Sequence, residues 1–182
     1  MNNPFTELPI NMAGVRLFEP RVFRDTRGDF VKTYHADAYA MLGIRFTLAE
    51  EFYSVSKKHV LRGMHFQLPP HDHAKIVYCV AGRVLDVLLD LRKGSPTFGN
   101  CVGIEMGVGD HRILYIPPGL AHGFLSLEDQ SLMIYQTSAV HAPSHDVGIH
   151  WDSFGFKWPV QHPIVSVRDA AFQPLAGFAS PF

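Results

Sequence analysis

Short apolar segments separated by turn-forming residues recur along most of the chain, and this pattern limits the possible folds more than any other feature. The segments follow one another at roughly 8–12 residue spacing, with Gly, Pro and Asp between them. Strands at this spacing predict an antiparallel sandwich or barrel, because parallel strands need long, usually helical crossovers. We therefore predict an all-β fold, a double-sheet jelly roll in which the paired sheets protect strand edges.

The expected strands are Val15–Phe18, Arg21–Phe23, Phe30–His35, Phe46–Tyr53, Val60–Gln67, Ile76–Val80, Arg83–Asp90, Cys101–Met106, Ile113–Ile116, Gly123–Leu127 and Leu132–Thr137. Short helices are expected only near the ends, over Ala36–Leu42, which Gly43 terminates, and over Val167–Phe172. A chain of 182 residues without a visible linker or repeat is expected to form a single domain, residues 1–182.

Net charge and the length of the apolar runs argue against several classes of partner. The net charge is −1 and no basic stripe is visible, so we expect no nucleic-acid partner. No apolar run approaches ~18 residues and the N-terminal residues lack a signal-peptide pattern, so we expect no membrane association and a cytoplasmic location. Cys79 and Cys101 lie in apolar segments and are expected to be buried, reduced thiols.

A polar cluster lies between two apolar segments over Val60–Lys75, a stretch that contains an Arg, a Gln, three His and a Lys. Buried polar groups cost free energy unless they are paired, so we interpret this stretch as half of an active site. On a strand, His65 and Gln67 share one face, while Met64 and Phe66 share the other. His65 is then a candidate base in a pocket, whereas a lone His would more often be a hydrogen-bonded core residue.

Other polar residues have both a structural and a functional interpretation. Strict alternation turns Arg62 away from His65, but a bulge at Gly63 would bring both to one side. Lys75 would either extend its ammonium group to water or hold a developing negative oxygen in the pocket. Tyr135 lies in an apolar strand, where most Tyr side chains pack with a satisfied hydroxyl.

A second motif ends at His122, where Pro-x-Gly-x-x-His looks like the second motif of metal-binding cupins. His71-Asp72-His73 looks like the His-x-His part of their first motif, but no carboxylate follows at the expected distance. Imidazoles with a carboxylate are the usual ligands of Zn²⁺ or non-haem iron, so a metal site of His71, His73 and His122 is the second interpretation. Otherwise His71 and His73 are exposed loop residues.

Segments spread over nearly the whole chain resemble motifs of the dTDP-4-dehydrorhamnose 3,5-epimerase family: Phe23–Gly28, Val60–Gln67, Asp90–Gly99, Ile116–Phe124, Gly148–Asp152 and Ser166–Ala170. The resemblance implies a cupin-type double-stranded β-helix and a homodimer built by exchange of N-terminal strands. It also implies an isomerase that acts on a nucleotide-diphosphate sugar and needs neither a metal nor another cofactor.

The resemblance also assigns roles to individual residues. The catalytic residues it implies are the base His65, the carboxylate Asp169 that orients this base, Lys75 near the C4 oxygen of the sugar, and the general acid Tyr135. The substrate-binding residues it implies are Arg27 and Arg62 on the diphosphate, His122 in the sugar pocket, and Gln67, Glu50, Asp146 and Arg168.

These residue types suit the inversion of a carbon next to a ketone. Hydrogens at C3 and C5 of a 4-keto sugar are acidic, because the carbanion becomes an enolate. A neutral His can take such a proton near pH 7, and a carboxylate on its other nitrogen fixes the tautomer. Lys75 would stabilise the enolate oxygen, and Tyr135 on the opposite face would return a proton and so invert the centre.

Some positions depart from the usual family pattern and leave the substrate less defined. Glu50 and Phe52 stand where family members usually carry the amides of Gln-x-Asn-x-Ser. Val140 and His141 replace an aromatic pair, one ring of which stacks on thymine in the family, and Asp146 stands where Glu is common. Three histidines of this late segment are expected at the surface or the pocket rim: His141, His145 and His150.

The sequence therefore predicts an epimerase that inverts C3, C5 or both in a nucleotide-linked 4-keto-6-deoxy sugar, namely dTDP-4-dehydro-6-deoxyglucose or a close relative. The alternatives are a single-centre epimerase acting on a CDP or GDP sugar, a metal-dependent cupin oxygenase, and a catalytically silent sugar-nucleotide binder.

Overall fold

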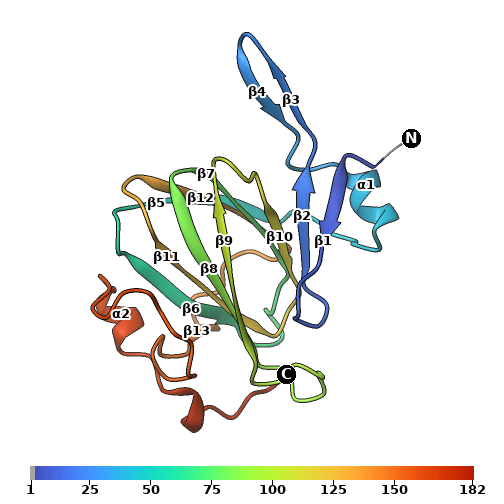
Figure 1. Cartoon of the computed structure of the whole chain (residues 1–182). Helices are drawn as coiled ribbons and strands as arrows, with labels where there is room; N and C mark the ends of the chain where they lie inside the picture. The colour runs from blue at the N-terminus through green and yellow to red at the C-terminus, as the bar shows by residue number, and fades with distance from the viewer. Residues whose placement is uncertain (1–2) are drawn as a thin grey trace.

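The computed structural model describes residues 3–182, which form two facing antiparallel sheets and a projecting hairpin (Figure 1). The strands of the first sheet are, in spatial order, β1 (Phe5–Leu8), β2 (Arg16–Pro20), β10 (Ile113–Ile116), β7 (Lys75–Ala81), β12 (Ser131–Thr137) and β5 (Glu50–Ser56). Those of the second sheet are β13 (Asp146–Gly148), β6 (Leu61–Gln67), β11 (Leu120–Ser126), β8 (Arg83–Asp90) and β9 (Cys101–Gly107). The prediction of an all-β double-sheet jelly roll is confirmed.

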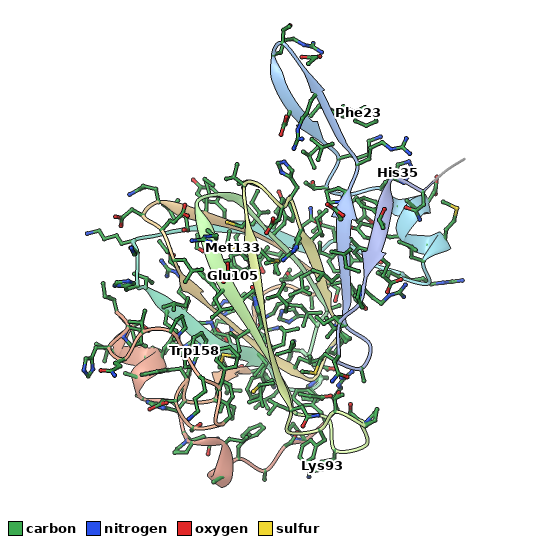
Figure 2. The ribbon with its side chains drawn as sticks, in the orientation of Figure 1. Phe23, His35, Lys93, Glu105, Met133 and Trp158 are labelled. Atoms are coloured by element: carbon green, nitrogen blue, oxygen red, sulfur yellow. The ribbon has the colours of Figure 1, made fainter. Side chains whose placement is uncertain are left out.

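The hairpin consists of β3 (Val22–Asp25) and β4 (Gly28–Val31), and it extends away from both sheets (Figure 1). Phe23 on this hairpin stands clear of the body of the molecule (Figure 2). Its side chain and that of Phe30 are more than half exposed, at 54% and 63%. The hairpin therefore offers apolar surface that this chain alone does not cover.

The helices are short and lie near the ends of the chain, as predicted. The first, α1 (Ala36–Met41), begins where the His35 side chain accepts a hydrogen bond from the backbone N–H of Ala38. It packs beside the N-terminal strands, where Tyr39 stacks on Phe5 with ring centroids 4.8 Å apart. The second, α2 (Val167–Ala170), lies in the C-terminal segment, which continues through a 3₁₀ turn at Leu175–Gly177.

The main hydrophobic core fills the space between the two sheets. Fully buried side chains such as Val77 and Met133 from the first sheet pack in one cluster with Leu88 and Phe124 from the second. A further apolar cluster, which includes residues of the C-terminal segment, packs on the second sheet, where Phe66 makes edge-to-face contacts with the rings of two phenylalanines near the C-terminus, Phe178 and Phe182. The second sheet is thus held between two apolar layers, which gives the residues on β6 and β11 a rigid support.

A bulge at Gly63 sets the direction of the side chains on β6. His65 pairs with His122 of β11, whereas Arg62 pairs with Phe124, so β6 carries one residue more than β11 between these two pairs. Gly63 has a φ of +140°, and an added Cβ would lie 2.5 Å from the Cα of Gly123. The bulge brings Arg62 and His65 into the same cavity, which confirms the exception that the sequence allowed.

Several element boundaries differ from the predicted ones for local reasons. The strand expected over Phe46–Tyr53 begins only at Glu50, because Phe46 packs against the cluster around α1. The strand expected over Phe30–His35 ends at Val31, before the residue that caps α1. The two short strands β1 and β13 were not predicted, because neither forms an apolar segment of its own.

Both cysteines are free thiols, as predicted, although only Cys79 is buried and Cys101 is partly exposed. Between residues 3 and 182, none of the helices is long and apolar enough to span a membrane.

Candidate active site

A cavity of about 440 Å³ lies between the two sheets, within the size range of small-molecule sites. Strands β5, β7 and β12 of the first sheet form one wall, and β6 and β11 of the second form the other. The sequence-predicted site residues that line it are Glu50, Arg62, His65, Gln67, Lys75, His122, Tyr135 and Asp146. Segments far apart in the sequence therefore supply one site, and only three of the predicted residues, Asp169, Arg168 and Arg27, lie outside its lining.

Asp169 holds the ring of His65 from behind the cavity. The Nε2 atom of His65 lies 2.8 Å from Oδ1 of Asp169, and the other carboxylate oxygen accepts a hydrogen bond from the backbone N–H of Gly63 at 3.0 Å. The carboxylate is itself placed by α2, where the N–H of Asp169 donates to Oγ of Ser166 at 3.0 Å. Two elements, β6 and α2, thus fix one imidazole before any substrate binds.

The hydrogen bonds of this pair decide which nitrogen of His65 carries the proton. Burial alone would raise the pKa of Asp169, but the bonds from His65 and the Gly63 N–H outweigh it and hold the pKa below its usual value. Asp169 is therefore an ionised acceptor at neutral pH, so Nε2 of His65 carries the hydrogen. The Nδ1 lone pair remains available to take a proton from a bound molecule.

Tyr135 stands on the opposite wall, on β12 of the first sheet. Its hydroxyl lies 3.2 Å from Oγ of Ser54, and its ring stacks on Phe52 with centroids 4.8 Å apart and planes 14° apart. Burial raises the pKa of Tyr135 well above its usual value, so the phenol stays protonated. The residue can therefore donate a proton, whereas His65 across the cavity can accept one.

Lys75 brings a positive charge into the cavity from the start of β7. Its Nζ donates to the backbone carbonyl of His65 at 3.3 Å and forms no salt bridge with any carboxylate of residues 3–182. Burial lowers the pKa of Lys75 to about 8, although the charges of Asp146 and Asp86 act in the opposite direction. A buried ammonium group without a close anion is well suited to hold a negative oxygen that develops during a reaction.

The pKa of Lys75 predicts the alkaline limit of activity. A lowered lysine pKa means that the cation is present below about pH 8 and lost above it, so kcat/KM should fall about tenfold per pH unit beyond that point. In Lys75→Arg the guanidinium stays charged, so this decline should disappear even if the overall rate is lower. A pH profile of kcat/KM for both proteins checks this, and an unchanged alkaline decline in the Arg variant would contradict it.

A second histidine–carboxylate pair, His122 and Asp86, lies beside the first, and only its histidine was predicted as a site residue. Nε2 of His122 is 2.7 Å from Oδ2 of Asp86, which is fully buried on the neighbouring strand β8. The other oxygen of Asp86 has no hydrogen-bond partner within residues 3–182. Asp86 was not predicted as a site residue, although a carboxylate on an inward position of the apolar strand Arg83–Asp90 was the available signal.

The mouth of the cavity carries a network of charged groups. Asp146 lies 2.9 Å from Nε2 of His141 and 2.9 Å from the guanidinium of Arg168, which places Arg168 behind the lining rather than in it. Glu50 accepts a hydrogen bond from the backbone N–H of His141 at 2.7 Å. Three of the positions that depart from the family pattern, Glu50, His141 and Asp146, are therefore linked by hydrogen bonds, and His141 lies at the rim as predicted.

Arg27 and the histidines proposed as metal ligands are not brought together as the sequence predicted. Arg27 is at the tip of the hairpin, where it pairs with Asp25, and it does not line the cavity. The proposed metal ligands are also separated in their contacts, because the ring of His71 lies against that of His145 with the planes tilted by 53°, and His122 bonds Asp86. In the described part of the chain, no group of three or more His, Cys, Asp or Glu side chains is placed to hold a metal ion.

A base on one wall, an acid on the other and a cation between them can move protons on and off a carbon next to a carbonyl group. This capacity, within a jelly roll, places the chain among the cupin-type acid–base enzymes.

Comparison with known proteins narrows the class. The sequence profile of dTDP-4-dehydrorhamnose 3,5-epimerase matches residues 9–177. An enzyme of that name from Shigella flexneri is 40% identical over 172 residues, which are 93% of either chain. A dTDP-4-dehydrorhamnose 3-epimerase of Streptomyces niveus is 37% identical over 88% of this chain and 79% of its own. The crystal structure of a 3,5-epimerase from Bacillus anthracis with TDP and PPi bound superposes with a TM-score of 0.92 at 33% identity, covering 94% and 99% of the two chains.

The chain belongs to the dTDP-4-dehydrorhamnose 3,5-epimerase family. The family resemblance, the cupin-type fold and the prediction of an isomerase are confirmed.

Proposed function

We propose that the protein inverts C3 and C5 of dTDP-4-dehydro-6-deoxyglucose and so forms dTDP-4-dehydrorhamnose. The observation that carries this proposal is that His65 and Tyr135 lie on opposite walls of one cavity, with the Lys75 ammonium group between the sheets beside them. Inversion requires two proton-transferring groups on opposite faces of the sugar ring, and the two sheets supply one each.

The reaction proceeds by the same two steps at each centre. Nδ1 of His65 takes a proton from the carbon next to the C4 ketone. The C–H electrons form a C=C bond, and the carbonyl π electrons move onto the C4 oxygen to give an enolate. Lys75 holds the negative oxygen while Asp169 stabilises the imidazolium. Tyr135 then gives its proton to the other face of the carbon, where the C=C electrons form the new C–H bond. The electrons on the C4 oxygen re-form the ketone, and Tyr135 is left as a phenolate. Proton exchange with water restores His65 and Tyr135.

A single-centre epimerase is the second candidate, because one feature of this chain favours it. Phe52 replaces an amide of the family and lies flat against Tyr135, whose hydroxyl also meets Ser54. A ring held from two sides has less freedom to reach two carbons of one substrate. The similarity to the Streptomyces niveus 3-epimerase is consistent with this reading.

Product analysis separates these candidates. The protein is incubated with dTDP-4-keto-6-deoxyglucose, the C4 ketone is reduced with borohydride, and the released 6-deoxyhexoses are separated by chromatography. Rhamnose is expected when both centres are inverted, and a sugar altered at one centre only would select the single-centre reading. Recovery of unaltered sugar with the dTDP substrate, but inversion with the CDP or GDP analogue, would overturn the nucleotide assignment.

We further propose a homodimer in which the β3–β4 hairpin of each chain lies against its partner. The hairpin exposes Phe23 and Phe30, while β5, an outer strand of the first sheet, exposes Phe52, Tyr53 and Val55. Strands β1 and β2 pair within their own sheet, so an exchange would use the hairpin, which carries Arg27. Sedimentation equilibrium should give twice the 20.4 kDa mass of one chain, and a monomer at micromolar concentration would contradict this.

We place the protein in the cytoplasm, where free thiols such as Cys79 stay reduced.

A further inference from the structure

Gln67 joins three segments around the cavity, and its amide orientation is fixed by the backbone. Its Nε2 donates to the carbonyl of His71 at 2.7 Å, and its Oε1 accepts from the N–H of Ala142 at 2.6 Å. A carbonyl cannot donate and an N–H cannot accept, so the amide cannot be flipped. The side chain is 4% exposed, and its polar atoms are used within the protein.

The orientation of Gln67 determines the tautomer of His73. The second hydrogen on Nε2 of Gln67 points to Nδ1 of His73 at 3.0 Å, whereas the carbonyl of Val140 is farther away at 3.4 Å, so Nδ1 is the acceptor in this pair. A contact of Nδ1 with the carbonyl of His71 is longer, at 3.4 Å, and would compete only if Nδ1 carried the hydrogen. A neutral His73 therefore carries its hydrogen on Nε2, which has no hydrogen-bond partner in the described chain, and the ring lines the cavity.

His73 is also kept neutral by its surroundings. Burial, together with the positive charge of Lys75, lowers the pKa of His73 to about 4, while the backbone carbonyl of His71 and the carboxylates of Asp146 and Asp72 act in the opposite direction. A protonated ring would turn an N–H toward the N–H of Gln67 and would add a second cation beside Lys75. The residue thus offers the cavity a hydrogen-bond donor without a charge.

We propose that His73 is a substrate-binding residue whose Nε2–H donates to the C3 hydroxyl of the sugar. The proposal rests on the proposed function, because it takes Lys75 as the partner of the C4 oxygen. His73 lies two residues before Lys75 on the same cavity wall, so it faces a substituent next to C4. Of the two carbons that flank C4, C5 carries a methyl group and the ring oxygen, which is already bonded to two carbons and accepts hydrogen bonds weakly. C3 carries a hydroxyl group, which is the better acceptor.

This assignment replaces the metal-ligand interpretation of His73 with a role in substrate selection. A neutral donor favours substrates with an oxygen at C3 over 3-deoxy analogues. It does not draw the bound anion away from Lys75, as a second cation would.

The contact between His73 and the C3 hydroxyl can be isolated by changing the substrate and the side chain in the same experiment. We would measure KM from C5 hydrogen exchange with the 4-keto-6-deoxy substrate and with its 3-deoxy analogue, for the wild type, His73→Leu and His73→Gln. The wild type should bind the 3-deoxy analogue about threefold to tenfold more weakly, the size of one neutral hydrogen bond. His73→Leu should lose that preference, and His73→Gln, which can still accept from Gln67 and donate to the sugar, should keep it.

The outcomes separate this proposal from the function on which it rests. A His73→Leu protein that weakens both substrates equally has lost structure rather than a contact, and this would overturn the assignment of His73 alone. The absence of exchange in the wild type would overturn the proposed function. Imidazole ¹⁵N NMR tests the tautomer without turnover: His73 should remain a neutral Nε2–H ring as the pH falls through 6.5, the ordinary value for His. An Nδ1–H or charged ring there would also overturn the proposal.

Discussion

Replacing His65 by alanine should lower epimerisation by about 10²–10⁴-fold, the usual contribution of a positioned general base. The loss follows from the removal of the Nδ1 lone pair, which no other group on the β6 wall replaces in the same position. His122 is the nearest imidazole in register, but its Nε2 is bound to Asp86 rather than to Asp169. The rate is measured under substrate saturation, so that the chemical step rather than binding is compared.

Ligand binding should survive this change, because His65 acts on the sugar carbon and not on the nucleotide. Binding of dTDP measured by calorimetry should be nearly unchanged. His162→Ala is a matched control, since His162 is exposed and lies outside the cavity lining. Full activity in the His65 variant would mean that the base has been assigned to the wrong residue.

Replacing Tyr135 by phenylalanine should separate proton removal from inversion. The ring and its stack on Phe52 are retained, and only the hydroxyl that meets Ser54 is lost. His65 can still take a proton and return one from solvent to the same face, so hydrogen exchange should continue. Formation of the inverted sugar should fall by about 10²–10⁴-fold, because no acid remains on the opposite wall.

In deuterated water this difference can be seen in one experiment. The Phe variant should incorporate deuterium into substrate that keeps its original configuration, whereas the wild type places deuterium in the inverted product. Tyr53→Phe is the control, since Tyr53 is 68% exposed on the same strand as Phe52. Normal inversion by the Tyr135 variant would show that the acid is another group.

The residues that the sequence predicted well are those whose positions follow from strand alternation. His65 and Tyr135 project from regular strands of opposite sheets, so a period of two places each on an inward face once a double sheet is assumed. The carboxylate of Asp169 came only through the family resemblance, because its contact with His65 joins residues more than a hundred positions apart.

The features of the site that the sequence could not predict depend on contacts between neighbouring strands and on the position of an exposed hairpin. Arg62 changes sides because of one extra residue at Gly63, and the pairing of β6 with β11 determines this rather than the local sequence. Asp86 gains its role from a histidine on the adjacent strand, and His73 gains its tautomer from Gln67. Arg27 lies on the projecting hairpin, outside the cavity lining of its own chain, and the dimer proposed above would place it near a cavity.

Hydrogen exchange in D₂O tests the central claim most directly. The wild-type protein is incubated with dTDP-4-keto-6-deoxyglucose, and the sugar protons are followed by NMR. If one base and one acid on facing walls invert the carbons next to the ketone, the C3 and C5 signals should both disappear as the inverted sugar forms. Persistence of both signals, with the dTDP substrate and with its CDP and GDP analogues, would contradict the account.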